Sequence, residues 1–107
     1  MMNYFAIPGI KIAKPRMEGI LLAVNEVFPF SKSEVFQRCR RREYIEVRQI
    51  IQYLYSELLN ISQKEIGKRT GGFNHCTIVH SIKCIRNRMA VDKRFRDKIN
   101  SIKHRIP

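Results

Sequence analysis

The chain has 107 residues, of which 44% are hydrophobic and only 5 are Gly and 4 are Pro. This is enough for one domain with a self-sufficient core, and it excludes a second independent domain, a disordered tail and a fibrous repeat. The 21 Lys and Arg residues exceed the 9 Asp and Glu residues by 12, so the surface is expected to bind polyanions. Nucleic acid is the leading partner because Lys and Arg release counterions from phosphates, and an anionic membrane is the alternative.

The first part of the chain divides into an arm and a helix. Pro8-Gly9 and Pro15 interrupt regular structure, so residues 1–15 are predicted to form an extended arm ahead of a domain at 16–107. From Arg16, apolar residues follow helical spacing until Pro29. The pattern Ser31-Lys32-Ser33-Glu34 then resembles a capping box and predicts a second, short helix through Phe36.

A cluster of arginines separates this short helix from a long one. Four arginines fall within residues 38–42, namely Arg38, Arg40, Arg41 and Arg42. Their mutual repulsion is tolerable at a solvated or anion-bound site, so the cluster is a candidate phosphate clamp, and a plain solvated loop is the alternative. Residues 43–60 contain no Gly or Pro and carry apolar side chains at steps of three and four, which predicts a long core helix.

Three further helices are predicted in the second half of the chain. Ser62 and Glu65 form another capping box, and the helix they begin should end near Arg69 because Gly71 and Gly72 follow. Asn74 is expected to cap the next helix, which carries one apolar stripe of Ile78, Ile82, Ile85 and Met89. Residues 92–102 should form the last helix. The predicted fold is therefore an all-α, compact bundle of about six helices.

The pair of helices around the double glycine has the helix-turn-helix pattern. A short capped helix, a turn containing Gly and a longer second helix characterise this motif, whose second helix enters the major groove of DNA. On the side opposite the apolar stripe, helical projection places Cys76, His80, Lys83 and Asn87. The first turn offers short polar side chains that are candidates for contacting base edges: Asn74, His75, Cys76 and Thr77.

The roles of the candidate base-reading residues have alternatives. Asn74 is suited to adenine and the Thr77 methyl to the thymine methyl, but both residues could instead serve the helix start, or do both. His75 is expected to contact DNA. Cys76, His80 and Cys84 form a row along one helix, which cannot surround a tetrahedral zinc ion, so no metal site and no cofactor are expected.

Nothing in the sequence points to catalysis or export. The chain lacks phosphate-loop, zinc-protease and nucleophile-elbow motifs, so it is not expected to be an enzyme. Three cysteines without a C-x-x-C pair are unsuited to a disulfide framework and fit a reducing cytoplasm. The apolar runs are too short for a secretory signal or a membrane span, so no membrane partner is expected.

Residues 19–99 resemble the C-terminal DNA-binding domain of the bacterial replication initiator DnaA. The most specific part is GGFNHCTIVH at residues 71–80, which is similar to the family signature GGRDHTTVLH. Arg48-Gln49 and Ser62-x-x-Glu65-Ile66-Gly67 fall in the same register. The resemblance implies a Trp-repressor-like helical fold. Phe73-Asn74 stand where the family has Arg-Asp, and Cys76 replaces its first Thr, so the preferred sequence is expected to differ.

The resemblance also implies roles for individual residues. The segment His75-Cys76-Thr77 would read the major groove of a DnaA-box-like site, and an arginine of the 40–42 run, Arg40 being the closest match, would enter the minor groove. Phosphates would be held by Arg48, Gln49 and the helix start at Ser62, Gln63 and Lys64. Lys83, on the same outward side, is a further phosphate candidate.

The overall expectation is a sequence-specific binder of double-stranded DNA, linked to replication initiation and acting by binding alone. It is expected to lack the family's ATPase part, to bind as a monomer, and to be a bacterial or phage-encoded, nucleoid-associated protein. Two alternatives remain: a transcriptional repressor, and a module that docks to replication proteins through an exposed Phe73. RNA binding ranks below these because no base-stacking pattern is visible.

Overall fold

A computed structural model describes residues 17–30, 32–36, 41–59 and 61–106 of the chain. These residues form six helices and no strand, which confirms the all-α prediction: α1 (Met17–Val27), α2 (Lys32–Val35), α3 (Arg42–Leu58), α4 (Gln63–Arg69), α5 (His75–Val91) and α6 (Lys93–Arg105). The predicted arm at 1–15, the Ser31 cap and residues 38–40 of the arginine cluster lie outside the described residues. Within the described helices, none is long and apolar enough to cross a bilayer.

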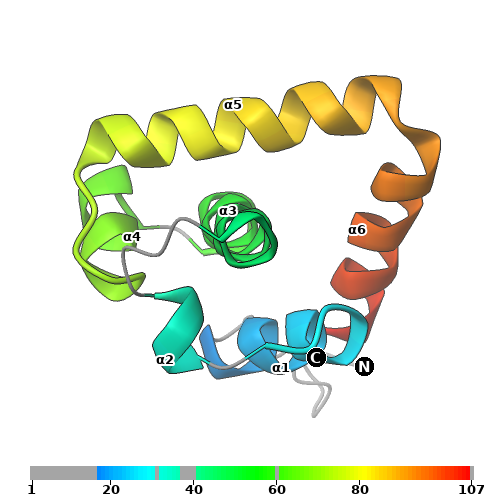
Figure 1. The fold of residues 1–107 in the computed structure, drawn as a ribbon, viewed down its shortest axis with the longest axis horizontal. Helices are drawn as coiled ribbons and strands as arrows, with labels where there is room; N and C mark the ends of the chain where they lie inside the picture. The colour runs from blue at the N-terminus through cyan, green and yellow to red at the C-terminus, as the bar shows by residue number, and fades with distance from the viewer. Residues whose placement is uncertain (1–16, 31, 37–40, 60, 107) are drawn as a thin grey trace, which may run out of the picture.

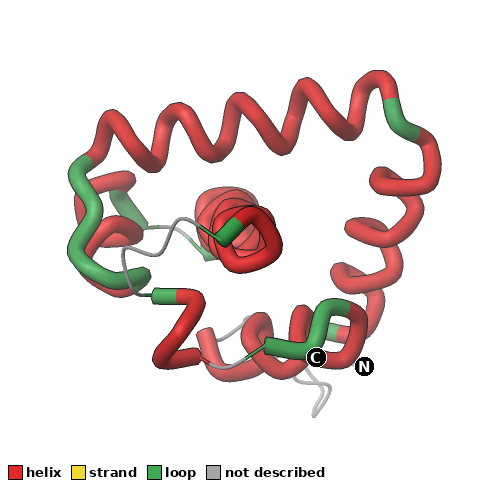
Figure 2. The backbone as a smooth tube through the Cα atoms, in the orientation of Figure 1, coloured by secondary structure: helices red, strands yellow, loops and turns green. Residues whose placement is uncertain are grey.

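Helix α3 is the axis around which the other helices are arranged. In Figure 1 it is seen end-on at the centre, with α5 above it, α4 at one side, α6 at the other and α1 below. Figure 2 shows that short loops connect the helices of the second half of this frame. Because α3 is surrounded, eight of its residues are buried: Val47, Arg48, Ile50, Ile51, Gln52, Tyr53, Leu54 and Tyr55.

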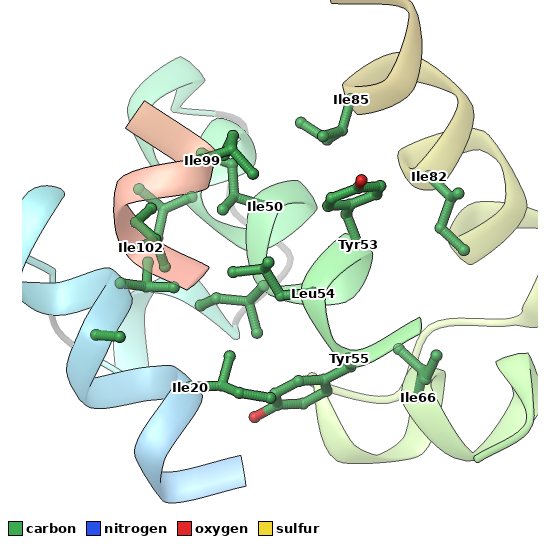
Figure 3. Close-up of a cluster of buried hydrophobic side chains, with 14 of the residues drawn as sticks. Ile20, Ile50, Tyr53, Leu54, Tyr55, Ile66, Ile82, Ile85, Ile99 and Ile102 are labelled. Carbon is green, nitrogen blue, oxygen red and sulfur yellow. The ribbon is translucent and has the colours of Figure 1, made fainter. Parts of the chain in front are cut away.

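The core joins helices that are distant in the sequence. Figure 3 shows Ile20 of α1 and Ile102 of α6 near Leu54 of α3, and all three side chains are fully buried. Burying an aliphatic side chain of this size stabilises the fold by about 1.5–3 kcal/mol. Tyr55 is also buried, and loss of hydration raises the pKa of its hydroxyl to about 12, with the nearby Glu18 charge acting in the same direction.

Side-chain caps begin the helices of the second half, as the sequence predicts for two of them. The Ser62 side chain accepts a hydrogen bond from Glu65 N at 3.1 Å, and Asn74 accepts one from Thr77 N at 3.0 Å. Asp92 ends α5 and caps α6 by accepting from Phe95 N at 3.1 Å. Each such cap is worth about 1 kcal/mol relative to Ala, so the helix starts are set locally.

Candidate nucleic-acid interface

The turn between α4 and α5 depends on close backbone contacts. Gly71 and Gly72 have φ values of 113° and 81°, which other residue types rarely adopt. The amides of Gly72 and Phe73 both donate to the carbonyl oxygen of Gly67, at 2.9 and 3.0 Å. A Cβ at Gly67 would collide with the Phe73 carbonyl, and one at Gly71 with the Phe36 carbonyl. The three glycines therefore allow the turn to fold tightly against α4 and the end of α2.

Buried polar contacts hold this turn against α3. Gln52 Nε2 donates to Thr70 Oγ1 at 3.0 Å, and Thr70 Oγ1 donates to the Ile66 carbonyl at 2.8 Å. Because Gln52 and Thr70 are both completely buried, water does not compete for these bonds. The end of α4 is therefore held at a defined position relative to α3, and the entry to α5 is held with it.

Helix α5 has one face in the core and one in solvent, as predicted. Ile78, Ile82 and Ile85 are buried, and Met89 packs against the core. The opposite face carries exposed polar side chains: His75, Cys76, His80, Lys83 and Asn87. The first turn of α5 therefore projects toward solvent at the outer edge of the molecule (Figure 1).

The thiols on this helix lie next to imidazoles. Cys76 Sγ is 3.7 Å from His75 Nε2, and Cys84 Sγ is 3.4 Å from His80 Nε2. Within the described part of the chain, no three His, Cys, Asp or Glu side chains are grouped so that they could hold a metal ion. These contacts instead orient the side chains of the exposed face.

The Asn74 side chain serves the helix start. Its Oδ1 accepts from Thr77 N at 3.0 Å and from Thr77 Oγ1 at 3.2 Å. Of the alternatives posed by the sequence, the capping role is therefore present. Asn74 is also exposed, so a base contact by the same residue stays a prediction.

A shallow hollow of about 440 Å³ lies where α4 meets the start of α5. It is lined by Lys64 and Lys68 of α4 and by residues 72–75, so two positive charges flank the first turn of α5. Lys68 was not among the sequence candidates. The signal that could have found it is its position four residues after Lys64, which places both on one face of a helix. A second hollow brings Gln63 of α4 together with Lys83 and Asn87 of α5.

Arg48, which the sequence predicts to hold a phosphate, is largely buried between α3, the end of α2 and the turn. Only 8% of Arg48 is exposed, and its Nη1 donates to the Val35 carbonyl at 3.3 Å. Its guanidinium also lies over the Phe73 ring, 4.5 Å from the centroid. A guanidinium engaged in this way links α2, α3 and the turn, and its contact with a phosphate stays a prediction.

The same contact bears on the role expected for Phe73 as an anchor for a partner protein. The interaction-module hypothesis was based on an exposed aromatic ring at the turn, whereas Phe73 is half-buried, packs against the core and lies beneath Arg48. It is therefore part of the turn's packing. This explains how a phenylalanine is accommodated where the resembling family has an arginine.

Most of the remaining phosphate candidates lie at helix starts. Arg41 and Arg42 are exposed at the beginning of α3, whereas Arg40 lies outside the described residues. Gln49 is half-exposed on α3, while Ser62, Gln63 and Lys64 are exposed at the beginning of α4. The structure thus brings Lys64 next to the first turn of α5 and places Gln63 beside Lys83.

Comparison with known proteins identifies the family of this helical unit. The family model described as the bacterial DnaA protein helix-turn-helix matches residues 17–85, from α1 into α5. The chain belongs to this bacterial DnaA helix-turn-helix family. The sequence-based resemblance to DnaA is therefore confirmed.

Individual DnaA relatives match most of this chain. It is 38% identical over 84 residues to the chromosomal replication initiator protein DnaA of Ehrlichia ruminantium (strain Gardel), covering 78% of the chain and 18% of the relative. It is 31% identical over 86 residues to the protein of the same name from Bacteroides thetaiotaomicron, which covers 80% of the chain and 18% of the relative. It is 31% identical over 100 residues to the DnaA protein of Streptococcus thermophilus (strain LMD-9), which covers 94% of the chain and 22% of the relative. The chain spans about a fifth of the length of these relatives.

Proposed function

We propose that this DnaA-type domain binds double-stranded DNA at specific, DnaA-box-like sites and acts in the initiation of replication. The observation that carries the proposal is the exposed first turn of α5, with short polar side chains at its surface and Lys64 and Lys68 beside it. A helix start of this kind suits base edges in a major groove, while flanking lysines suit phosphates. Binding alone, without catalysis, is sufficient for such a role, which would place the protein at the nucleoid.

In this proposal, the base-reading side chains come from the start and outer face of α5. They are Asn74, His75, Cys76, Thr77 and His80. Reading by short side chains loses little conformational entropy, because few rotatable bonds are restricted. The sequence preference should therefore depend on these five positions.

The phosphate contacts would surround this reading surface. Helices α4 and α5 would contribute the cations Lys64, Lys68 and Lys83 and the uncharged Ser62 and Gln63. The start of α3 would contribute Arg41 and Arg42. Arg40, which precedes them, is the proposed minor-groove residue. Five described cations, each neutralising one phosphate, predict that log K falls with log salt at a slope of about −4.5. These contacts position the domain without selecting the sequence.

The test is selection of bound sequences from a random duplex pool, followed by titration of a selected duplex at two salt concentrations. We expect one short enriched site and a steep salt dependence. Lys64→Gln combined with Lys68→Gln should weaken selected and unselected duplexes by the same factor. No enriched site, with no salt-dependent binding, would contradict the proposal.

Monomeric binding is the second part of the proposal. A dimeric repressor selects palindromes with half-sites about 10 base pairs apart, whereas a monomer selects a single asymmetric site. The same selection therefore tests the stoichiometry. A palindromic site with two chains per duplex would favour a repressor over an initiator-type binder.

A further inference from the structure

The hydrogen bonds of Asn74 determine which of its amide atoms is left for DNA. Oδ1 accepts from Thr77 N at 3.0 Å and from Thr77 Oγ1 at 3.2 Å. A backbone N–H can only donate, so the side-chain atom facing it must be the oxygen and not the nitrogen. The orientation of the amide is therefore set by the cap itself.

An amide oxygen has two lone pairs, and Thr77 occupies both. What Asn74 has left is the Nδ2 group with its two hydrogens, on an exposed residue at the start of α5. The usual pairing of Asn with adenine needs the oxygen to accept from N6 while the nitrogen donates to N7. With its oxygen engaged, Asn74 cannot form that pair.

We infer that Asn74 reads its base pair as a hydrogen-bond donor only, and that it selects guanine over adenine. This inference rests on the proposed DNA-binding function. It revises the expectation from the sequence, in which the amide of Asn74 was suited to adenine.

The order of preference follows from the major-groove edges. Guanine presents two neighbouring acceptors, N7 and O6, which both hydrogens of Nδ2 can approach. Thymine presents one acceptor, O4, and adenine one acceptor, N7, next to an N6 donor. Cytosine presents only its N4 donor, which opposes another donor. Asn74 should therefore enrich guanine most and cytosine least at the position it faces.

Two substitutions at position 74 keep a cap and change the atoms presented to DNA. Asp and Ser are both good N-caps, so Asn74→Asp and Asn74→Ser should leave the thermal midpoint almost unchanged. Aspartate presents only acceptors, so it should move the preference from guanine to cytosine or adenine. Serine is too short to span to the base and should leave the position nearly unselective.

A third substitution tests the saturation of Oδ1 directly. Thr77→Val removes the Oγ1 donor and keeps the branched shape, which frees one lone pair of Asn74 Oδ1. Adenine should then rise relative to guanine at the same position. If the preference for guanine did not change, occupation of both lone pairs of Oδ1 would not be its cause.

The experiment is selection from a random duplex pool with the full chain and these three variants, followed by competition between duplexes that differ at one base pair. We expect the wild-type chain to prefer guanine over cytosine by roughly 5- to 150-fold, and Asn74→Asp to reverse the ratio. A uniform loss of affinity in Asn74→Asp, from carboxylate repulsion by phosphate, would leave this ratio readable.

The outcomes separate the inference from the function on which it rests. If the wild-type chain enriches no site, the DNA-reading function itself fails. If it enriches a site whose composition is the same in all variants, or one in which adenine depends on Asn74, DNA reading stands and the donor-only role of Asn74 is overturned.

Discussion

Positive charge lies at both ends of α5, but it is arranged differently at each. The two ends are separated by about 25 Å, the length of a helix of 17 residues. At its N-terminal end, short polar side chains are exposed at a hollow that two lysines of α4 also line. At its C-terminal end, α6 carries six Lys and Arg residues within 13, the higher local charge of the two ends.

Three of the six cations of α6 nevertheless contact other groups of the protein. Lys98 lies 5.5 Å from the Phe28 ring and Lys103 lies 5.5 Å from the Tyr53 ring. Arg105 is 3.6 Å from a carboxylate oxygen of Glu26. A positive charge excess therefore indicates attraction for polyanions, whereas reading a base sequence needs exposed short side chains held in a fixed turn.

The largest expected effect comes from breaking that turn. Gly67→Ala should lower the free energy of unfolding by about 3 kcal/mol, because the new Cβ collides with the Phe73 carbonyl. Urea denaturation of the full chain measures the loss. Gly72→Ala is the matched control, since its Cβ would meet open space and only the φ of 81° is unfavourable, costing about 1–2 kcal/mol. Equal losses in the two variants would show that the close approach at Gly67 is unimportant.

The next effect distinguishes a packing role of Arg48 from a phosphate role. Arg48→Met keeps the aliphatic stem but leaves the buried Val35 carbonyl without this donor, so stability should fall by about 2 kcal/mol. DNA affinity of the folded protein should stay the same. Thermal unfolding and duplex titration below the transition measure the two quantities separately. Weaker DNA binding at unchanged stability would support the phosphate role predicted from the sequence.

A smaller effect tests the exposed first turn of α5. His75→Ala should reduce discrimination at one base pair by about 1 kcal/mol and leave binding to unselected duplexes nearly unchanged. Lys64→Gln is the contrasting variant, and it should lower affinity for every duplex and reduce the salt slope by about 1. Competition titrations at two salt concentrations distinguish them. Uniform weakening in both variants would mean that His75 does not read a base.

The smallest effect is expected at the other end of α5. Lys93→Gln combined with Arg94→Gln alters exposed side chains of α6, so stability should change by less than about 0.5 kcal/mol. The site selected from a random duplex pool should be identical to that of the unmodified chain. A changed base preference would show that the reading surface extends to α6, and would contradict the view that only the N-terminal end of α5 reads bases.

Local patterns in the sequence determined the helices and where they begin. The apolar stripe of α5 and the caps at Ser62 and Asn74 were predictable, because helical spacing and capping involve residues only three or four positions apart. The double glycine likewise predicted a turn, since positive φ is a local property of the backbone. Most of the exposed face of α5 followed from the same periodicity.

Tertiary structure alone decided which side chains of this surface are available. A period of 3.6 residues says that a residue faces inward or outward, but it does not say which partner it meets there. Arg48 was expected at a phosphate, but it is buried against Val35 and Phe73. Both residues are more than ten positions away from it in the sequence. The hollow that brings Lys68 to the start of α5 likewise exists only once α4 packs on α5, because long-range packing and not local propensity places the charges beside the reading turn.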